Sequence, residues 1–302
     1  MGFSSFDALI NAMTVNGTTQ KMCYLNKITT PVHTAAGWHA MSGLTGWPVA
    51  NTYPGASLAW VGCSDSAGNG TDIFGIQHGG NVSPATKHVI NVMAEITAAA
   101  GLPGIAMLVD LQGYYKLSGA DVTSTTSRTL TGTPSMRYTN GVGCFPYIVS
   151  VTQPTAGGPT ISASSYTNSA GTTTRAFPGT LVMNATANAY ATRIIHSGQA
   201  AGNYAPFLPL QAGDTGVASI QSFTFSAGTA YTGSGVLAIC IARPLLALPI
   251  TTSGLAAERD LVNQLPSMPQ IKDGACLEWL LYMSGATTNL SPFIAAFDCA
   301  WN

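Results

Sequence analysis

The sequence predicts a mainly β protein with a β-sandwich or jelly-roll-like body and a few short helices. Thr, Val, Ile, Tyr and Phe recur in short runs that Gly, Pro, Asn and Ser interrupt, which is typical of strands joined by turns. Helix signals do not alternate with these runs, so a parallel α/β architecture is disfavoured. With 302 residues, the chain can bury a large β-rich core.

The clearest helix signal covers residues 84–100. Ser83 can cap this segment, Pro84 suits a first helical position, and Gly101 with the proline that soon follows ends it. Four apolar residues would share one face of this amphipathic helix: Val89, Met93, Ile96 and Ala100.

Two shorter helices are predicted elsewhere. Residues 6–13 place apolar side chains at helical spacing behind Ser5, which is a candidate cap. Residues 255–265 show a similar spacing, and Pro266 would end that helix.

Alternating apolar residues predict the strands, most strongly at the carboxyl end. In residues 293–301 every second side chain from Phe293 to Trp301 faces one way, so we expect one large buried face. Residues 277–283 alternate in the same manner, and SGATTNLS between the two runs predicts a hairpin. The other candidate strands are residues 105–110, 147–151, 181–185, 190–195, 220–225 and 236–242.

Two polar stretches are predicted to be loops that stay mobile unless a partner orders them. They are residues 119–132 and 152–174, the second of which has hardly any large apolar side chain. A division near Gly104 would separate an N-terminal α+β region, residues 1–104, from a β-sandwich body, residues 105–302. No strong linker marks this division, so a single domain is the alternative.

Charge is scarce, above all in the middle of the chain. Residues 138–257 contain only four charged side chains: Arg175, Arg193, Asp214 and Arg243. Charged residues make up 8% of the whole chain, whereas about a quarter is usual in soluble domains. We therefore expect another copy of the chain or a larger assembly to cover much of this surface, which favours a structural role.

The totals disfavour nucleic-acid and membrane partners. Eleven basic and twelve acidic residues give a formal net charge of -1, so no cationic excess is available to neutralise phosphates. The best apolar run, residues 236–250, is interrupted by Arg243 and two prolines, whereas a spanning helix needs about 20 apolar residues. The opening MGFSSFDALI lacks the basic segment of a secretory signal.

The sequence contains no catalytic, cofactor-binding or metal motif that we can assign. Patterns for a nucleophilic serine hydrolase and for a phosphate-binding loop are absent. We expect structural roles for the five histidines, which are His33, His39, His78, His88 and His196. We also expect reduced, mostly buried cysteines, although their even number leaves a disulfide open: Cys23, Cys63, Cys144, Cys240, Cys276 and Cys299.

Four carboxylates are candidates for a catalytic pair, but we do not expect any two of them to act as one. Glu95 and Glu258 fall on predicted helix surfaces. Asp110 and Asp298 lie within apolar strand patterns and are the better candidates for buried acids with a shifted pKa. An inward Asp also serves as a hydrogen-bond anchor or blunts a sheet edge.

Two further groups have both a structural and a functional interpretation. The segment SDSAGNGTD, with Asp65, Asn69 and Asp72, loosely resembles a calcium loop, although a turn with Asx hydrogen bonds explains it better. The aromatic residues of the N-terminal region could stack on sugars or serve as core or interface anchors: Trp38, Trp47, Tyr53 and Trp60.

Two passages resemble virion structural proteins of tailed bacteriophages. They are MLVDLQGYYKLSGADVTSTTSRTLTGTPSMRYTNGVGCFPYIVSV and LVNQLPSMPQIKDGACLEWLLYMSGATTNLSPFIAAFDCAWN, and they are similar to that class in overall pattern. The resemblance implies a capsid cement or decoration protein, commonly a β-sandwich that assembles as trimers on the shell. It carries over no catalytic residues. The major capsid protein is a poorer match, because its long spine helix and extended charged loop cannot be placed here.

The sequence thus favours a non-enzymatic virion protein, assembled in the host cytoplasm, that stabilises a phage capsid. Its partners would be the major capsid protein or other virion subunits and its own copies. The alternative is a carbohydrate-binding or host-adhesion β-module of a virion, which would use the Trp and Tyr cluster. A hydrolase with an unrecognised site is a third hypothesis.

Overall fold

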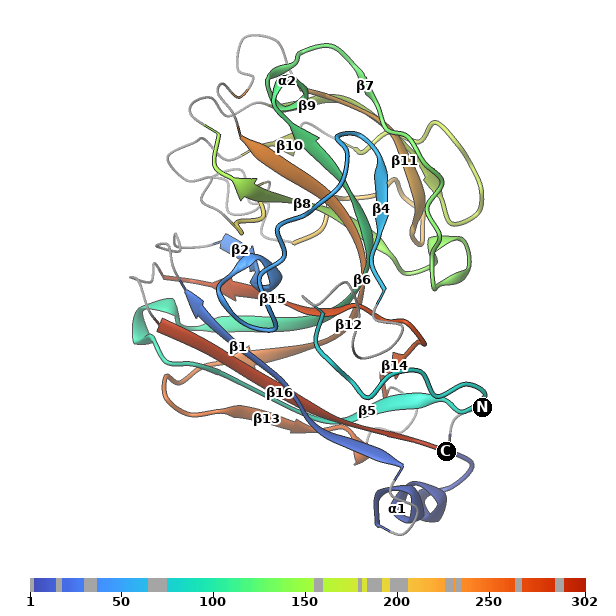
Figure 1. Cartoon of the computed structure of the whole chain (residues 1–302), viewed down its shortest axis with the longest axis vertical. Helices are drawn as coiled ribbons and strands as arrows, with labels where there is room; N and C mark the ends of the chain where they lie inside the picture. Colours follow the sequence, from blue (N-terminus) through green and yellow to red (C-terminus); the bar gives the residue numbers. More distant parts are fainter. Residues whose placement is uncertain are drawn as a thin grey trace.

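The computed structural model describes residues 3–14, 18–29, 37–64, 75–154, 160–178, 181–183, 192–195, 206–225, 231, 235–263, 268–285 and 291–302. Strands dominate it, and the named strands pair antiparallel in three sheets that are stacked from bottom to top in Figure 1. The prediction of a mainly β, sandwich-like protein is therefore confirmed. We refer to the three as the lower, middle and upper sheets.

The sheets draw on strands from distant parts of the chain. The lower sheet runs β13-β5-β16-β1-β3, with β14 beside β5: Ala257–Asp260, Lys87–Ile96, Ser291–Trp301, Thr19–Thr29, Gly46–Trp47 and Gln270–Ile271. The middle sheet runs β2-β15-β6-β12-β8, with β4 beside β6: Gly37–Ala40, Leu277–Met283, Gly104–Ser118, Val236–Ile250, Phe145–Thr152 and Trp60–Gly62. The upper sheet runs β10-β9-β11-β7: Leu181–Val182, Thr160–Asn168, Val217–Phe225 and Arg128–Thr129.

Helical elements are short. Among the described residues the named helical elements are the α-helices α1 (Phe6–Thr14) and α2 (Ala120–Thr123) and the 3-10 turns η1 (Met41–Gly43), η2 (Ala99–Gly101) and η3 (Thr139–Gly141). The prediction of a helix in residues 6–13 is confirmed by α1. Its cap is confirmed too, because the Ser5 hydroxyl accepts a hydrogen bond of 3.1 Å from the Ala8 N–H.

Two long strands, β6 and β12, join the lower and upper halves of the molecule (Figure 1). Leu108 of β6 packs in the core against the lower sheet, whereas Tyr115 packs in the core against the upper sheet. In a regular strand these two side chains would point to opposite faces. The pairing skips Gln112, and this bulge brings both onto the same face.

The lower and upper sheets thus cover the two ends of one face of the middle sheet. A second bulge in β12, where the pairing skips Leu245, acts in the same way: Ile239 faces the upper core and Leu248 the lower core. The other face of the middle sheet carries a third core, which includes Leu111 and Cys240. At each end of β6 and β12 the middle sheet therefore has a packed core on both faces: the lower or upper core on one face and the third core on the other.

The predicted helix in residues 84–100 is wrong. Residues 87–96 form β5, which lies between β16 and β13, and inward positions such as Val92, Ala94 and Ile96 alternate with half-exposed ones. Ile96 suits a helical spacing with Val89 and a strand alternation with Val92 and Ala94, and strand pairing on both sides decides between them. Ser83 caps no helix, because residues 83–86 form a turn that leads into β5, and its N–H donates to Asp273 at 3.2 Å.

Two further predictions for the C-terminal part are wrong. Residues 257–260 form β13 rather than a helix, because they pair with β5; residues 264 and 265 lie outside the described residues. The strands 277–283 and 293–301 exist as β15 and β16, yet they do not form a hairpin. β15 pairs in the middle sheet and β16 in the lower one, so Trp279 and Phe293 meet across the lower core.

The polar stretches that were expected to be mobile loops contain ordered structure. Residues 119–132 hold α2 and β7, and Val122 and Leu130 of this stretch are buried in the upper core. Residues 160–168 of the second stretch form β9, while residues 155–159 lie outside the described residues. The polar composition of these stretches did not reveal that apolar residues such as Val122 and Leu130 are buried in the core.

The predicted strands 105–110, 147–151, 220–225 and 236–242 fall within β6, β8, β11 and β12. Of the predicted strand 181–185, β10 covers only Leu181 and Val182, and residues 184, 185, 190 and 191 lie outside the described residues. Residues 192–195 contribute isolated bridges through Arg193 and Ile194. The division into residues 1–104 and 105–302 stays a prediction. Strands from both sides share sheets, since β16 pairs with β1 and with β5.

Candidate functional site: a basic cleft between the sheets

The gap between the lower and upper sheets holds a polar group of side chains. Asp110 of β6 and Arg243 of β12 are cross-strand neighbours, so they project on the same face of the middle sheet. They lie between Leu108, in the lower core, and Tyr115, in the upper core. Neither outer sheet covers this position, and the side chains there need not be apolar.

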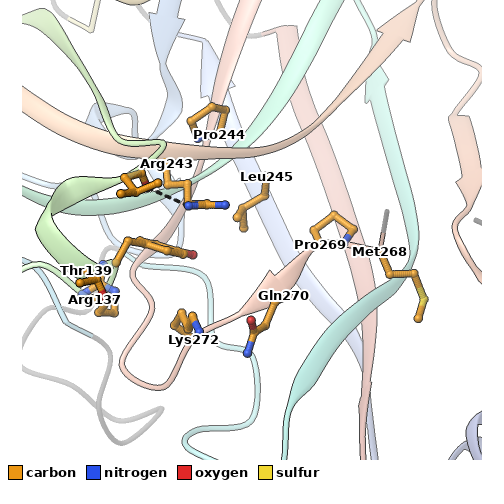
Figure 2. A pocket seen from close by; sticks show the side chains of 11 residues that line it. Arg137, Thr139, Arg243, Pro244, Leu245, Met268, Pro269, Gln270 and Lys272 are labelled. Atoms are coloured by element: carbon orange, nitrogen blue, oxygen red, sulfur yellow. Dashed lines mark hydrogen bonds between the residues drawn. The ribbon is translucent and has the colours of Figure 1, made fainter. Parts of the chain in front are cut away.

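A cleft of about 660 Å³ opens at this gap. Residues from three segments line it: 137–142, around η3; 243–245, at the bulge of β12; and 268–272, around β14. Figure 2 shows Arg243 and Leu245 on one side of the cleft and Gln270 and Lys272 on the other. We call it the basic cleft, because Arg137, Arg243 and Lys272 line it.

Arg137 is fully committed to neutralising Asp110. Its Nε donates to one Asp110 oxygen at 3.1 Å and its Nη2 to the other, while Nη2 also donates to the Leu111 carbonyl and Nη1 to the Cys63 carbonyl. The Cys276 N–H also donates to Asp110 at 3.1 Å. Burial alone would lower the pKa of Arg137, but the carboxylate of Asp110 raises it overall. This pair fixes the floor of the cleft.

Arg243 is held in place without a carboxylate. Its guanidinium carbon lies 4.4 Å from the centre of the Tyr138 ring, and its Nη1 donates to the Val142 carbonyl at 2.8 Å (Figure 2). Gly143 makes room for it: φ is +71° there, and a Cβ would lie 2.8 Å from Nη1.

Arg243 and Lys272 therefore carry positive charge that no described carboxylate neutralises. The ion pairs among the described residues are Arg128–Asp121, Arg137–Asp110 and Arg175–Asp214. A planar guanidinium and a mobile ammonium facing one cleft can bind a carboxylate or a phosphate. Pro244, Leu245 and Met268 add apolar contact surface beside them.

The predicted acids behave in different ways. Asp110 is a buried acid, as its apolar strand pattern indicated, and its partner Arg137 makes it an anchor. Asp298 lies on β16 and accepts a 2.8 Å hydrogen bond from the Met22 N–H. Glu95 and Glu258 were placed on helix surfaces, which is wrong: they lie on β5 and β13.

Each described histidine has a structural environment. His39 in β2 and His78 are buried, and the His78 ring lies 3.1 Å from the Ala275 carbonyl oxygen. His88 is half-buried in β5, where burial lowers its pKa. His33 and His196 lie outside the described residues.

The two groups with alternative interpretations have different outcomes. Asp65, Asn69 and Asp72 lie outside the described residues, and the part that is described contains no group of three or more His, Cys, Asp or Glu that could hold a metal. Of the aromatic cluster, Trp38 and Tyr53 are buried in the third core and Trp60 packs on Tyr115. Trp47 is 49% exposed, so the four do not form a stacking platform.

Sequence reasoning missed a buried polar cluster on the third-core side. Glu278 accepts a hydrogen bond from the Tyr147 hydroxyl, and burial raises its pKa. Lys27 donates to the Leu44 carbonyl at 3.0 Å, and burial lowers its pKa to about 8. The alternation of apolar residues in β15 predicts that the Glu278 side chain points away from the core. Only the loops that cover this face, which the strand pattern does not reveal, make it buried.

All six cysteines are buried and free, as expected from their spacing. They include two contacting pairs, in which Cys23 is hydrogen-bonded with Cys299 and Cys63 with Cys276. No helix in the described ranges is long and apolar enough to cross a membrane. Comparisons with protein-family models, curated proteins and solved structures found no match to this chain.

Proposed function

We propose that this chain is a non-enzymatic structural subunit of a virion, a cement or decoration protein that stabilises a bacteriophage capsid. It would act by contacting shell subunits and its own copies. The proposal rests on the resemblance of residues 107–151 and 261–302 to such proteins and on one structural observation, the neutral outer face of the upper sheet. That face has the chemistry of a surface that is covered in an assembly.

The outer face of β9 and β11 carries hydroxyl and amide side chains. Ser165 and Ser222 are cross-strand neighbours with hydroxyl oxygens 3.0 Å apart, and Gln221 donates to the hydroxyls of Thr167 and Ser219 at 2.7 Å each. These side chains are already fixed by one another. Covering them with a partner therefore costs little side-chain entropy, and no charge has to be desolvated.

The few charges of residues 138–257 lie away from this face or are neutralised. Arg175 donates to Asp214 at 3.1 Å through both Nε and Nη2, and Arg193 is buried. Interfaces are depleted in charged residues at their centre, so this distribution supports an interface here. Weak contacts of this kind gain strength when a lattice repeats them.

Adding the purified chain to expanded capsids that lack it tests the proposal. We expect saturable binding and a higher temperature of shell disruption. Ser222→Lys should weaken binding about tenfold or more, because it places an unpaired charge at the centre of the neutral face. Ala99→Lys, at the exposed first residue of η2, is the matched control and should bind normally. A chain that stays monomeric at high concentration and leaves the shells unbound contradicts the proposal.

A further inference from the structure

Two arginines and one acid meet at the basic cleft, and one arginine takes the acid. Asp110 is the cross-strand neighbour of Arg243, yet the ion pair that it forms is with Arg137. The Cys276 N–H also donates to the Asp110 carboxylate. Within the described residues Arg243 is therefore a surplus cation, although its neighbour across the strands is a carboxylate.

Two other arginines show what the open edge of Arg243 can hold. Arg137 binds Asp110 through its Nε and Nη2 atoms. Arg175 binds Asp214 through the same two atoms, each at 3.1 Å. In Arg243 the Nη1 atom donates to a backbone carbonyl, while Nε and Nη2 form no hydrogen bond within the described ranges. The edge that binds a carboxylate twice elsewhere in this molecule is thus open here.

The guanidinium of Arg243 is already held in one position. It lies over the ring of Tyr138, which is itself buried in the upper core. Gly143 leaves the space that this position needs, since a Cβ there would lie 2.8 Å from Nη1. A side chain that is fixed before binding loses little entropy when a ligand arrives.

The rest of the basic cleft favours a ligand that is partly apolar. Lys272 and Gln270 lie across the cleft from Arg243 (Figure 2), and the volume of about 660 Å³ is in the range of ligand sites. Apolar residues form much of the remaining wall: Pro244, Leu245, Met268 and Pro269. A bare inorganic anion would leave this wall uncovered, whereas an apolar group beside the anion would bury it.

We propose that the basic cleft binds a carboxylate that carries an apolar group beside it. Arg243 binds the carboxylate through Nε and Nη2, and Lys272 adds a second, mobile charge. Leu245 and Met268 cover the apolar group. Two sources have this chemistry, a small carboxylic acid and an acidic segment of another protein. The inference goes beyond the proposed function, because the capsid role rests on the neutral face of the upper sheet.

Isothermal titration calorimetry with blocked tripeptides tests this site. The probe is acetyl-Leu-Glu-Leu-amide, whose one charge is the side-chain carboxylate, and acetyl-Leu-Gln-Leu-amide is its uncharged match. We expect the acidic tripeptide to bind about tenfold more tightly or better. Arg243→Gln should remove that advantage, and Lys272→Gln should weaken binding about threefold, because a mobile ammonium contributes less than a fixed guanidinium.

Two further variants separate a built site from general electrostatic attraction. Lys116→Gln on β6 makes the same change of net charge outside the cleft and should leave the affinity within about twofold. Gly143→Ala keeps every charge but displaces the guanidinium of Arg243, so it should weaken binding about fivefold or more. Circular dichroism and melting temperature check that each variant is folded.

The choice of probes distinguishes the two sources. Binding of acetyl-leucine as tightly as the acidic tripeptide supports a small carboxylic acid, whereas binding of the tripeptide alone supports an acidic protein segment. Equal affinity for the Glu and Gln tripeptides contradicts the inference. Inorganic phosphate that binds as tightly as the acidic tripeptide, and depends equally on Arg243, contradicts it too, because the apolar wall would then play no part.

The acids outside the described residues, Asp65 and Asp72, are included in the test. The acidic tripeptide should bind the unaltered chain and the chain with Asp65→Asn and Asp72→Asn within about twofold. If it binds only the chain with these two changes, the protein's own carboxylates neutralise the cleft, and the inference is wrong.

Discussion

Raising the pH above 9 is expected to unfold the protein. Burial raises the pKa of the Cys144 thiol to about 12 and that of Cys240 well above its ordinary value. A hydrogen bond with Cys299, together with burial, raises the pKa of Cys23, and Cys63 has the same effect on Cys276. These four thiols stay protonated in the folded protein at a pH where exposed thiols ionise.

The sign of the effect follows from the proton count of each state. A thiol has an ordinary pKa of 9.0, so above that value the unfolded chain holds fewer protons than the folded one and the free energy of unfolding falls. Each thiol contributes a loss of about 1.4 kcal/mol per pH unit. Lys27 opposes this, because burial lowers its pKa from 10.5 to about 8 and stability therefore rises across that interval.

Between pH 9 and 10, four thiols against one lysine give a net loss that approaches about 4 kcal/mol per pH unit. Above pH 10 the buried hydroxyls of Tyr53 and Tyr147, whose pKa burial raises, add to the loss. A domain stability of about 5–15 kcal/mol would then be exhausted within a few pH units. Urea unfolding at pH 8, 9 and 10, followed by tryptophan fluorescence, measures the slope. Cys240→Ala should reduce it by about 1.4 kcal/mol per unit, whereas Lys27→Met should make it steeper. A free energy of unfolding that is flat from pH 8 to 10.5 contradicts this account.

Local sequence patterns predicted an element correctly where its apolar residues fit only one periodicity, either helical or strand. The cap and apolar spacing of α1 and the alternation in β15 and β16 needed no knowledge of the rest of the fold. β5 failed because its apolar residues suit two periods, and the pairing with β13 and β16 that settles the matter comes from over 150 residues away. Propensity is a weak prior when tertiary contacts of this kind compete with it.

The polar site was predictable only in part. Asp110 stood out because apolar residues surround it in the sequence, but Arg137 lies 27 residues away in a segment without a strand pattern. The basic cleft itself arises from the bulges at Gln112 and Leu245, which decide where the lower and upper sheets separate. Gly113 and Pro244 flank these positions and are residue types that often accompany a bulge, but they do not reveal which strands pair, so sequence alone does not place Arg243 beside Asp110.

Replacing Asp110 with alanine is expected to lower the free energy of unfolding by about 3–5 kcal/mol. The side chain of Asp110 is fully buried, and that of Arg137 is only 12% exposed. Without Asp110 the guanidinium keeps its charge in a poorly solvated position, and the Cys276 N–H loses its acceptor. Equilibrium urea unfolding at pH 7 measures the loss.

The ion pair between Asp121 and Arg128 supplies the matched control, since its side chains are 16% and 29% exposed. Asp121→Ala should cost less than Asp110→Ala, about 1–2 kcal/mol, because Arg128 keeps more contact with water, and part of that loss comes from the Ser57 hydroxyl, which donates to Asp121. A double-mutant cycle with Asp110→Ala and Arg137→Met should give a coupling energy of about 2 kcal/mol or more, because removing both partners leaves no buried charge. If Asp110→Ala costs no more than Asp121→Ala, water reaches Arg137, and the floor of the basic cleft is not the rigid ion pair described above.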